Sequence, residues 1–296
     1  MALSDLVVEA FILIRDSFFD DAGLPVPFEL REKRNTQDDP LDELIAKVLS
    51  DGLKGALCQK APGPLISPDL TIYRPELCNG SSRTLLREDT SRIVAIEVKK
   101  LERNKGKIAR ATGLDYNTTP PCGTVRVYDA NDLPLDIRGF YLFVAQEKLP
   151  EQQKYILSAL TLCDGNILND DFDFYLSITG QRSKSIGLGT YGDGLNRIRP
   201  MLVFANPLGA EELDHTATLI NQADVSSDQR LSLVYRIRRQ LGENSYREFL
   251  AYRKATDVNT HWQVEVLYDP FPQPKRRVET TQSRGKFSVP IKPGRE

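Results

Sequence analysis

The segment Ile93–Lys99 constrains the fold more than any other part of the chain. Its sequence, Ile-Val-Ala-Ile-Glu-Val-Lys, is an apolar run that ends in alternating charged residues. Such a β-branched run, free of Gly and Pro, predicts a strand inside a sheet. Because side chains alternate along a strand, Glu97 and Lys99 share one face. The opposite face is apolar and consists of Val94, Ile96 and Val98.

A second short strand is predicted at Leu70–Tyr73, after a loop of residues 61–68 that is rich in Pro and Gly. The same alternation directs its two aliphatic side chains to the core and leaves Asp69 on the opposite face. If the two strands are neighbours, Asp69 meets Glu97 and Lys99. The sequence therefore predicts two carboxylates and an ammonium group in one place.

This combination of groups suits phosphodiester hydrolysis. The reaction needs a hard cation held by oxygen ligands, a positioned water and positive charge near the transition state. Asp69 and Glu97, with the Val98 carbonyl, would form a Mg²⁺ site, because Mg²⁺ takes one or two carboxylates and keeps several waters. Lys99 would orient the attacking water or accept its proton.

Helices are predicted before these strands. Apolar residues spaced by three and four indicate an amphipathic helix over residues 3–18, and a second helix is predicted over Pro40–Asp51 with Asp39 as its N-cap. Further strands are expected at Val125–Tyr128 and Phe140–Ala145. Residues 74–92 are expected to form a polar connection. Strands mixed with helices indicate an α/β fold.

The second half of the chain has weaker patterns. Helices are predicted over residues 151–163, 211–221 and 228–241, strands over 174–178 and 201–204, and a hairpin over 247–254 and 263–268. The tail, residues 272–296, lacks periodicity and indicates an arm or a disordered segment. We therefore divide the chain into a core, residues 1–205, and a C-terminal extension, residues 206–296, packed on the core.

Pro68-Asp69 followed by Glu97-Val98-Lys99 resembles the signature of the PD-(D/E)XK nuclease superfamily, which includes most type II restriction endonucleases. The resemblance covers residues 39–145. In that family an acidic residue on the helix before the first strand often completes the site, and Glu43 occupies the matching place. The resemblance implies a restriction-endonuclease-like core, a central mixed β-sheet flanked by helices, with a C-terminal extension.

The function that this resemblance implies is Mg²⁺-dependent cleavage of double-stranded DNA at a short specific sequence by a type II restriction endonuclease. A homodimer follows by analogy, since a two-fold dimer most simply cuts both strands of a palindrome. The C-terminal extension would then supply recognition or dimer contacts. Two alternatives remain: a repair or junction-resolving nuclease of the same superfamily, and a non-catalytic DNA-binding module.

A DNA surface on this chain must be local, because the formal net charge is -2 and the pI is about 5.9. Basic residues cluster after the Glu-x-Lys strand, and polar segments follow at residues 113–123 and 181–184. The candidate DNA contacts in these segments are Arg103, Lys107, Arg110, Asn117, Thr118, Arg182 and Lys184. A solvated face, or a loop without a ligand, is the alternative reading of each.

Purely structural roles also fit the candidate site. Glu43 forms an i,i+4 pair with Lys47 on a helix face, Glu97 with Lys99 could be a surface pair on an edge strand, and Asp69 could begin a turn. All three together are a less economical explanation than one site.

Several other classes of protein are excluded by the sequence. The apolar residues near the start are interrupted by charges and follow no basic segment, which argues against a signal peptide and a membrane span. The four Cys are far apart, which favours free thiols in the cytoplasm. Residues 187–192 match G-x-G-x-x-G, but no helix pattern follows them, so a nucleotide cofactor is not expected.

Overall fold

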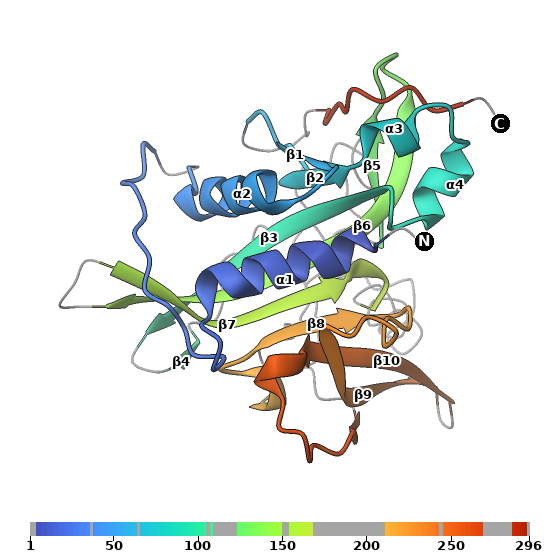
Figure 1. Ribbon diagram of the computed structural model, residues 1–296. Helices are drawn as coiled ribbons and strands as arrows, with labels where there is room; N and C mark the ends of the chain where they lie inside the picture. Colours follow the sequence, from blue (N-terminus) through green and yellow to red (C-terminus); the bar gives the residue numbers. More distant parts are fainter. Residues whose placement is uncertain are drawn as a thin grey trace, which may run out of the picture.

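The computed structural model describes residues 4–35, 38–63, 66–104, 107–108, 123–149, 154–167, 211–242, 245–268 and 286–294. A large mixed sheet forms the body of the molecule, with the strand order β1-β2-β3-β6-β7-β8-β10-β9-β11. Helices α1 (Leu6–Phe18) and α2 (Pro40–Gly52) lie side by side over one region of it (Figure 1). The chain is an α/β protein, as the sequence predicts.

The strands of the first half are β1 (Leu57–Lys60), β2 (Leu70–Tyr73), β3 (Ile93–Asn104), β4 (Lys107–Ile108), β5 (Thr124–Tyr128), β6 (Pro134–Leu149) and β7 (Lys154–Asp164). Those of the second half are β8 (Ala217–Asn221), β9 (Leu231–Gly242), β10 (Ser245–Lys254) and β11 (Glu265–Tyr268). Three pairs are parallel, β3 with β6, β7 with β8 and β9 with β11; the other pairs are antiparallel.

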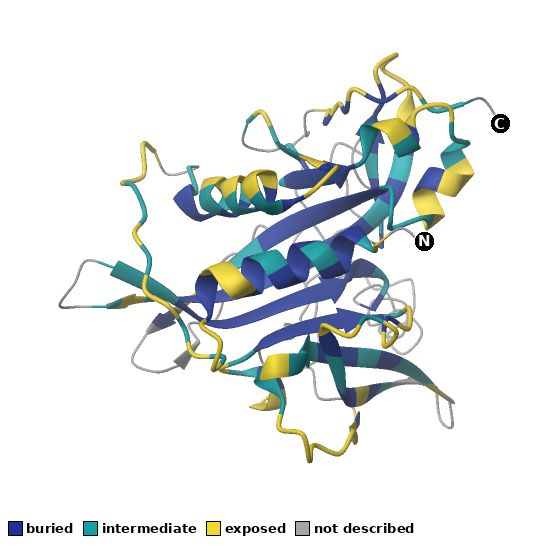
Figure 2. Cartoon of the chain, in the orientation of Figure 1, coloured by how far each residue is buried: buried dark blue, intermediate teal, exposed yellow. Residues whose placement is uncertain are grey.

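Both predicted N-terminal helices are present, and local sequence explains where they begin. Asp5 and Asp39 are the N-caps, and their carboxylates accept hydrogen bonds from Val7 N and Leu41 N. α1 is buried along most of its length, whereas α2 exposes one side to solvent (Figure 2). None of the described helices is long and apolar enough to cross a bilayer.

The central strand β3 has the two faces that its sequence predicts. Val94, Ile96 and Val98 belong to the core between the sheet and the two helices, together with Leu70 and Ile72 of β2. Glu97 and Lys99 therefore lie on the opposite face of the same strand.

Three helices predicted for the second half are wrong. Residues 154–164, 217–221 and 231–242 are strands, and of residues 211–221 only Glu211–Leu213 is helical, as a single 3₁₀ turn. The error for β7 has a physical cause: its residues from Leu157 onwards are buried on both faces, so apolar residues occur without alternation. Such a run also satisfies a helical spacing.

Other connections also differ from expectation. The segment of residues 74–92 contains two short helices, α3 (Pro75–Cys78) and α4 (Arg83–Glu88). The predicted hairpin is not formed, because β10 pairs with β9 and β11 joins the other edge of β9 in parallel. Consequently β8–β11 continue the sheet of the first half. The strands predicted over residues 174–178 and 201–204 lie outside the described residues.

The structure describes residues 286–294 of the predicted tail. Phe287, Val289 and Ile291 are buried at alternate positions and pack on the same cluster as Val125 and Val127 of β5. This final segment crosses the sheet beside β5 (Figure 1). Cys58, Cys78 and Cys163 are free thiols, and Cys122 lies outside the described residues.

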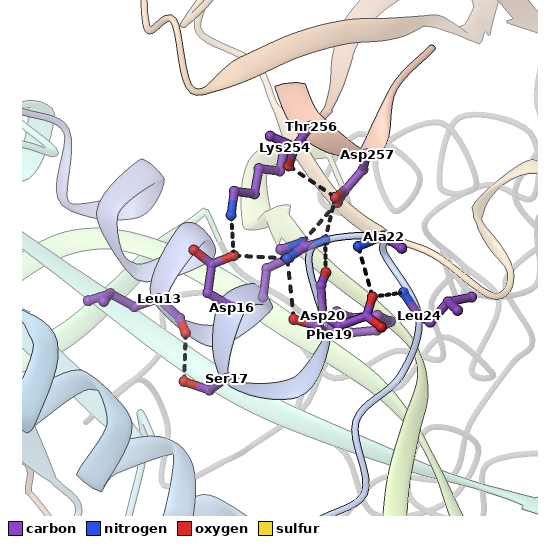
Figure 3. A network of polar contacts seen from close by, with 11 residues as sticks. Leu13, Asp16, Ser17, Phe19, Asp20, Ala22, Leu24, Lys254, Thr256 and Asp257 are labelled. Atoms are coloured by element: carbon purple, nitrogen blue, oxygen red, sulfur yellow. Dashed lines mark hydrogen bonds and ion pairs between the residues drawn. The ribbon is translucent and has the colours of Figure 1, made fainter.

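A buried ion pair ties the N-terminal helix to the C-terminal half. Arg15 of α1 is fully buried and donates to Asp257, which lies in the 3₁₀ turn Ala255–Asp257 after β10. The same guanidinium donates to Asp16 and to the Phe19 and Asp20 carbonyls. Figure 3 shows how Asp16, Lys254 and Asp257 are linked through this network.

We expect Asp257→Ala to destabilise the protein by about 3–5 kcal/mol, because it leaves the Arg15 charge buried without its carboxylate. The midpoint of urea unfolding measures the change. Asp21→Asn, at an exposed carboxylate on the loop that follows the same helix, is the matched control and should change stability by less than about 0.5 kcal/mol. Equal stability of the two variants would contradict a structural role for the ion pair.

Candidate active site

An acidic pocket of about 530 Å³ lies where β2 begins beside β3, next to the N-terminal part of α2. Five carboxylates and three basic side chains line it, so negative charge predominates. These side chains belong to Asp38, Asp39, Asp42, Asp69 and Glu97 and to Arg34, Lys60 and Lys99. A pocket with excess negative charge favours a cation.

The pairing of β2 with β3 brings together the three residues that the sequence singles out. Leu70 is opposite Ile96 in an antiparallel register, so Asp69 is next to Glu97 at the end of the pairing. The Asp69 carboxylate accepts a hydrogen bond of 2.8 Å from Val98 N. Asp69, Glu97 and Lys99 all line the acidic pocket.

Glu97 is held on both of its carboxylate oxygens. Ser67 Oγ donates to Oε2 at 2.6 Å, and Lys99 Nζ lies 2.9 Å from Oε1. The Glu97 residue is only 4% exposed, so a charge there needs such partners. The arrangement positions one carboxylate and one ammonium group side by side at the wall of the pocket.

The helix residue that reaches the pocket is Asp42, and Glu43 does not reach it. Glu43 is exposed and binds Arg31, with 2.8 Å between Arg31 Nε and Glu43 Oε2. The place in the site that was predicted for Glu43 is therefore corrected to Asp42, because successive residues of a helix point about 100° apart. Leu41, Ile45 and Leu49 are buried against the core, and this burial orients α2 so that Asp42 faces the site.

Like charges surround Asp42. Burial, together with the negative charges of Asp69 and Asp39, raises the pKa of Asp42 to about 8. Lys99 and Lys60 oppose this shift and do not cancel it. Carboxylates that repel one another in a partly buried pocket are the donor set that a hard divalent cation stabilises.

The donor chemistry of the site fits Mg²⁺. Asp69 and Glu97 would supply its protein oxygens, with water completing the coordination and Asp42 as a further carboxylate nearby. Among the described residues no three Asp, Glu, His or Cys side chains are close enough to one another to form a ready-made metal centre. One or two carboxylates suffice for Mg²⁺, and the Val98 carbonyl is the further oxygen that the sequence suggests.

Besides Asp42, two residues of the site are not indicated by the sequence, Ser67 and Lys60. Ser67 immediately precedes Pro68-Asp69, and only the fold shows that its hydroxyl reaches Glu97. Lys60, at the end of β1, lines the pocket because β1 pairs with β2 in a register that puts Lys60 opposite Leu70. Only the pairing of β1 with β2 reveals this position.

Of the predicted DNA contacts, only Arg103 has a side chain that the structure describes, and it does not line the acidic pocket. Arg103 is only 7% exposed and donates to Ser158 Oγ at 2.9 Å and to Asp214, so its prediction as a DNA contact is corrected to a buried structural ion pair. The backbone of Lys107 lies in β4, but its side chain is outside what the structure describes. The other five candidates lie outside the described residues: Arg110, Asn117, Thr118, Arg182 and Lys184.

Comparison of the chain with family models, with curated proteins and with solved structures gives no match.

A matched pair of variants on α2 tests the cation site. We expect Mg²⁺ at about 100 times its dissociation constant to raise the melting temperature of the unaltered protein by about 4 °C. Asp42→Asn should reduce this increase and should raise the melting temperature in EDTA, because it removes a repelling carboxylate. Glu43→Gln should leave the Mg²⁺-induced increase unchanged. An equal response of both variants in differential scanning fluorimetry would exclude Asp42 from the site.

Proposed function

We propose that the chain is a Mg²⁺-dependent endodeoxyribonuclease that hydrolyses phosphodiester bonds in duplex DNA. The observation that carries the proposal is the position of Asp69 and Glu97 on neighbouring strands of one pocket, with Lys99 Nζ 2.9 Å from the Glu97 carboxylate. The likeness of Pro68-Asp69 and Glu97-Val98-Lys99 to the PD-(D/E)XK signature supports the same conclusion.

The three side chains have distinct roles in this proposal. Asp69 and Glu97 hold the metal, which when bound supplies Lewis-acid stabilisation of the charge on the phosphate. Lys99 stands beside Glu97, where its ammonium group can orient the attacking water and donate to a phosphate oxygen. In the reaction the water oxygen bonds to phosphorus, a bridging P–O bond breaks, and the leaving oxygen takes up a proton.

The surroundings of the three residues support a phosphate substrate. The pocket is open to solvent on the side where Lys60 and Arg34 stand, and both are cations at its rim. These cations would contact flanking phosphates without regard to sequence. Ser67 and Asp42 complete the site, the first by positioning Glu97 and the second as an auxiliary acid beside Asp69.

The finer proposal is a type II restriction endonuclease. Cleavage at a short palindrome by one site per chain calls for a homodimer, and a cytoplasmic enzyme is in keeping with free thiols. Strands β8–β11 extend the sheet beyond the strands that form the pocket. Discrete fragments from a digested plasmid would separate this function from a nuclease that recognises DNA shape.

We expect Asp69→Asn, Glu97→Gln and Lys99→Met each to lower the rate of plasmid cleavage in Mg²⁺ by at least about 100-fold. Each removes one charge needed at the reacting phosphate, and Asn at position 69 retains an oxygen for the Val98 N–H. Gel electrophoresis of supercoiled plasmid follows the reaction. Glu43→Gln is the control and should cleave at the unaltered rate.

Binding and folding must be measured separately from cleavage. With Ca²⁺ in place of Mg²⁺, the three variants should still bind DNA, and their circular dichroism spectra should match that of the unaltered protein. Turnover within several-fold of the unaltered rate for any one variant would remove that residue from the mechanism. Absence of Mg²⁺-dependent cleavage in the unaltered protein would overturn the proposed activity.

A further inference from the structure

A second pocket, of about 370 Å³, shares a wall with the acidic pocket. Asp39, at the start of α2, lines both pockets, and its carboxylate binds Lys100 of β3. Because Lys99 and Lys100 are consecutive in a strand, their side chains point to opposite sides of the backbone, one toward each pocket. The two pockets are therefore adjacent.

The second pocket differs from the first in charge and in shape. Four basic and three acidic side chains line it, so its balance is positive where that of the acidic pocket is negative. They belong to Arg31, Lys33, Lys100 and Lys148 and to Glu32, Asp39 and Glu102. The remaining polar side chains of its wall are Gln146 and Tyr155. We call it the Gln146 pocket.

Gln146 of β6 is an unusual residue in this wall. It is only 7% exposed, it lines the pocket, and within the part of the chain that the structure describes its amide has no hydrogen-bond partner. The Gln146 amide is not among the described polar atoms that are fully buried without a partner, so it is open to the pocket, where a ligand can reach it. A ligand that offers both a donor and an acceptor would satisfy it.

The backbone presents Gln146 to the pocket. The pairing of β6 with β7 shifts register between Ala145 and Gln146. The extra residue, Ser158, belongs to β7, so β6 keeps its regular alternation and Gln146 lies on the same face of the sheet as Val144. Across the sheet, Gln146 is paired with Glu102 of β3, five residues beyond Glu97, so the amide stands on the strand next to the one that carries the catalytic pair.

We propose that the Gln146 pocket receives one nucleotide of the DNA strand that is cut in the acidic pocket, and that Gln146 reads its base as adenine. The inference rests on the proposed function, because it needs a DNA substrate. A carboxamide can donate and accept side by side, which matches N7 and the 6-amino group of adenine. Tyr155 supplies an aromatic surface at the wall, and the lysines supply cations for the attached phosphate.

The burial of Gln146 determines how the nucleotide must enter. A base edge inside a groove of stacked DNA cannot reach a side chain that is 7% exposed in a pocket, so the nucleotide must leave the stack. Unstacking costs a few kcal/mol. Hydrogen bonds to the Gln146 amide and contact with the Tyr155 ring offset this cost.

The test is selection of bound duplexes from a randomised library in Ca²⁺, followed by sequencing. The unaltered protein should enrich a motif with an obligatory adenine. Gln146→Leu, of similar size, should enrich the same motif with discrimination at that position reduced by about 10- to 100-fold. Gln146→Glu should shift the preference to cytosine, because a carboxylate only accepts and the cytosine amino group donates.

Controls make each outcome decisive. Glu147→Gln, at the next residue of β6 and outside the pocket wall, should leave the motif unchanged. Melting temperatures show whether the variants fold, and Gln146→Leu should keep the melting temperature of the unaltered protein because the two side chains are of similar size. An unchanged motif with Gln146→Leu, a uniform loss of affinity at all positions, or no motif for the unaltered protein would each overturn the proposal.

The same duplexes separate the two proposals. Incubation of the enriched duplex with Mg²⁺ measures cleavage by the unaltered protein. A motif that depends on Gln146 without cleavage would refute the nuclease function and leave the nucleotide pocket standing. Cleavage at a motif that is unchanged in Gln146→Leu would refute the nucleotide pocket and leave the nuclease function standing.

Discussion

The four residue pairs between β2 and β3 position the chemical groups of the acidic pocket. They place Asp69 next to Glu97, and the hydrogen bond from Val98 N fastens the Asp69 carboxylate to the neighbouring strand. A shift of one residue would turn Asp69 away and bury a carboxylate among the aliphatic side chains of the core. The same aliphatic residues that form this core therefore hold the two acids in register.

The helix α2 contributes through its rotation about its own axis. Its buried face packs on the core, and this leaves Asp42 directed at the pocket and Glu43 directed at Arg31. The N-cap Asp39 adds a second connection, because its carboxylate binds both the helix backbone and Lys100 of β3. Helix and sheet are thus joined at the point where the acidic pocket meets the Gln146 pocket.

The acidic pocket and the Gln146 pocket are adjacent but differ in charge. The acidic pocket has surplus carboxylates and suits a hard cation, whereas the Gln146 pocket has one more basic than acidic side chain and contains the Gln146 amide. Both pockets are lined by residues of β3, because consecutive side chains of a strand point to opposite sides of its backbone.

Local sequence determined the N-caps of α1 and α2, the two faces of β3, and the placement of Glu97 beside Lys99, because these depend only on residues near one another along the chain. Tertiary structure decided the rest. The choice of Asp42 over Glu43 depends on what α2 packs against, and β7 is a strand because its neighbours cover both faces. Both outcomes depend on contacts with residues distant in the sequence, and the local spacing of apolar residues does not indicate those contacts.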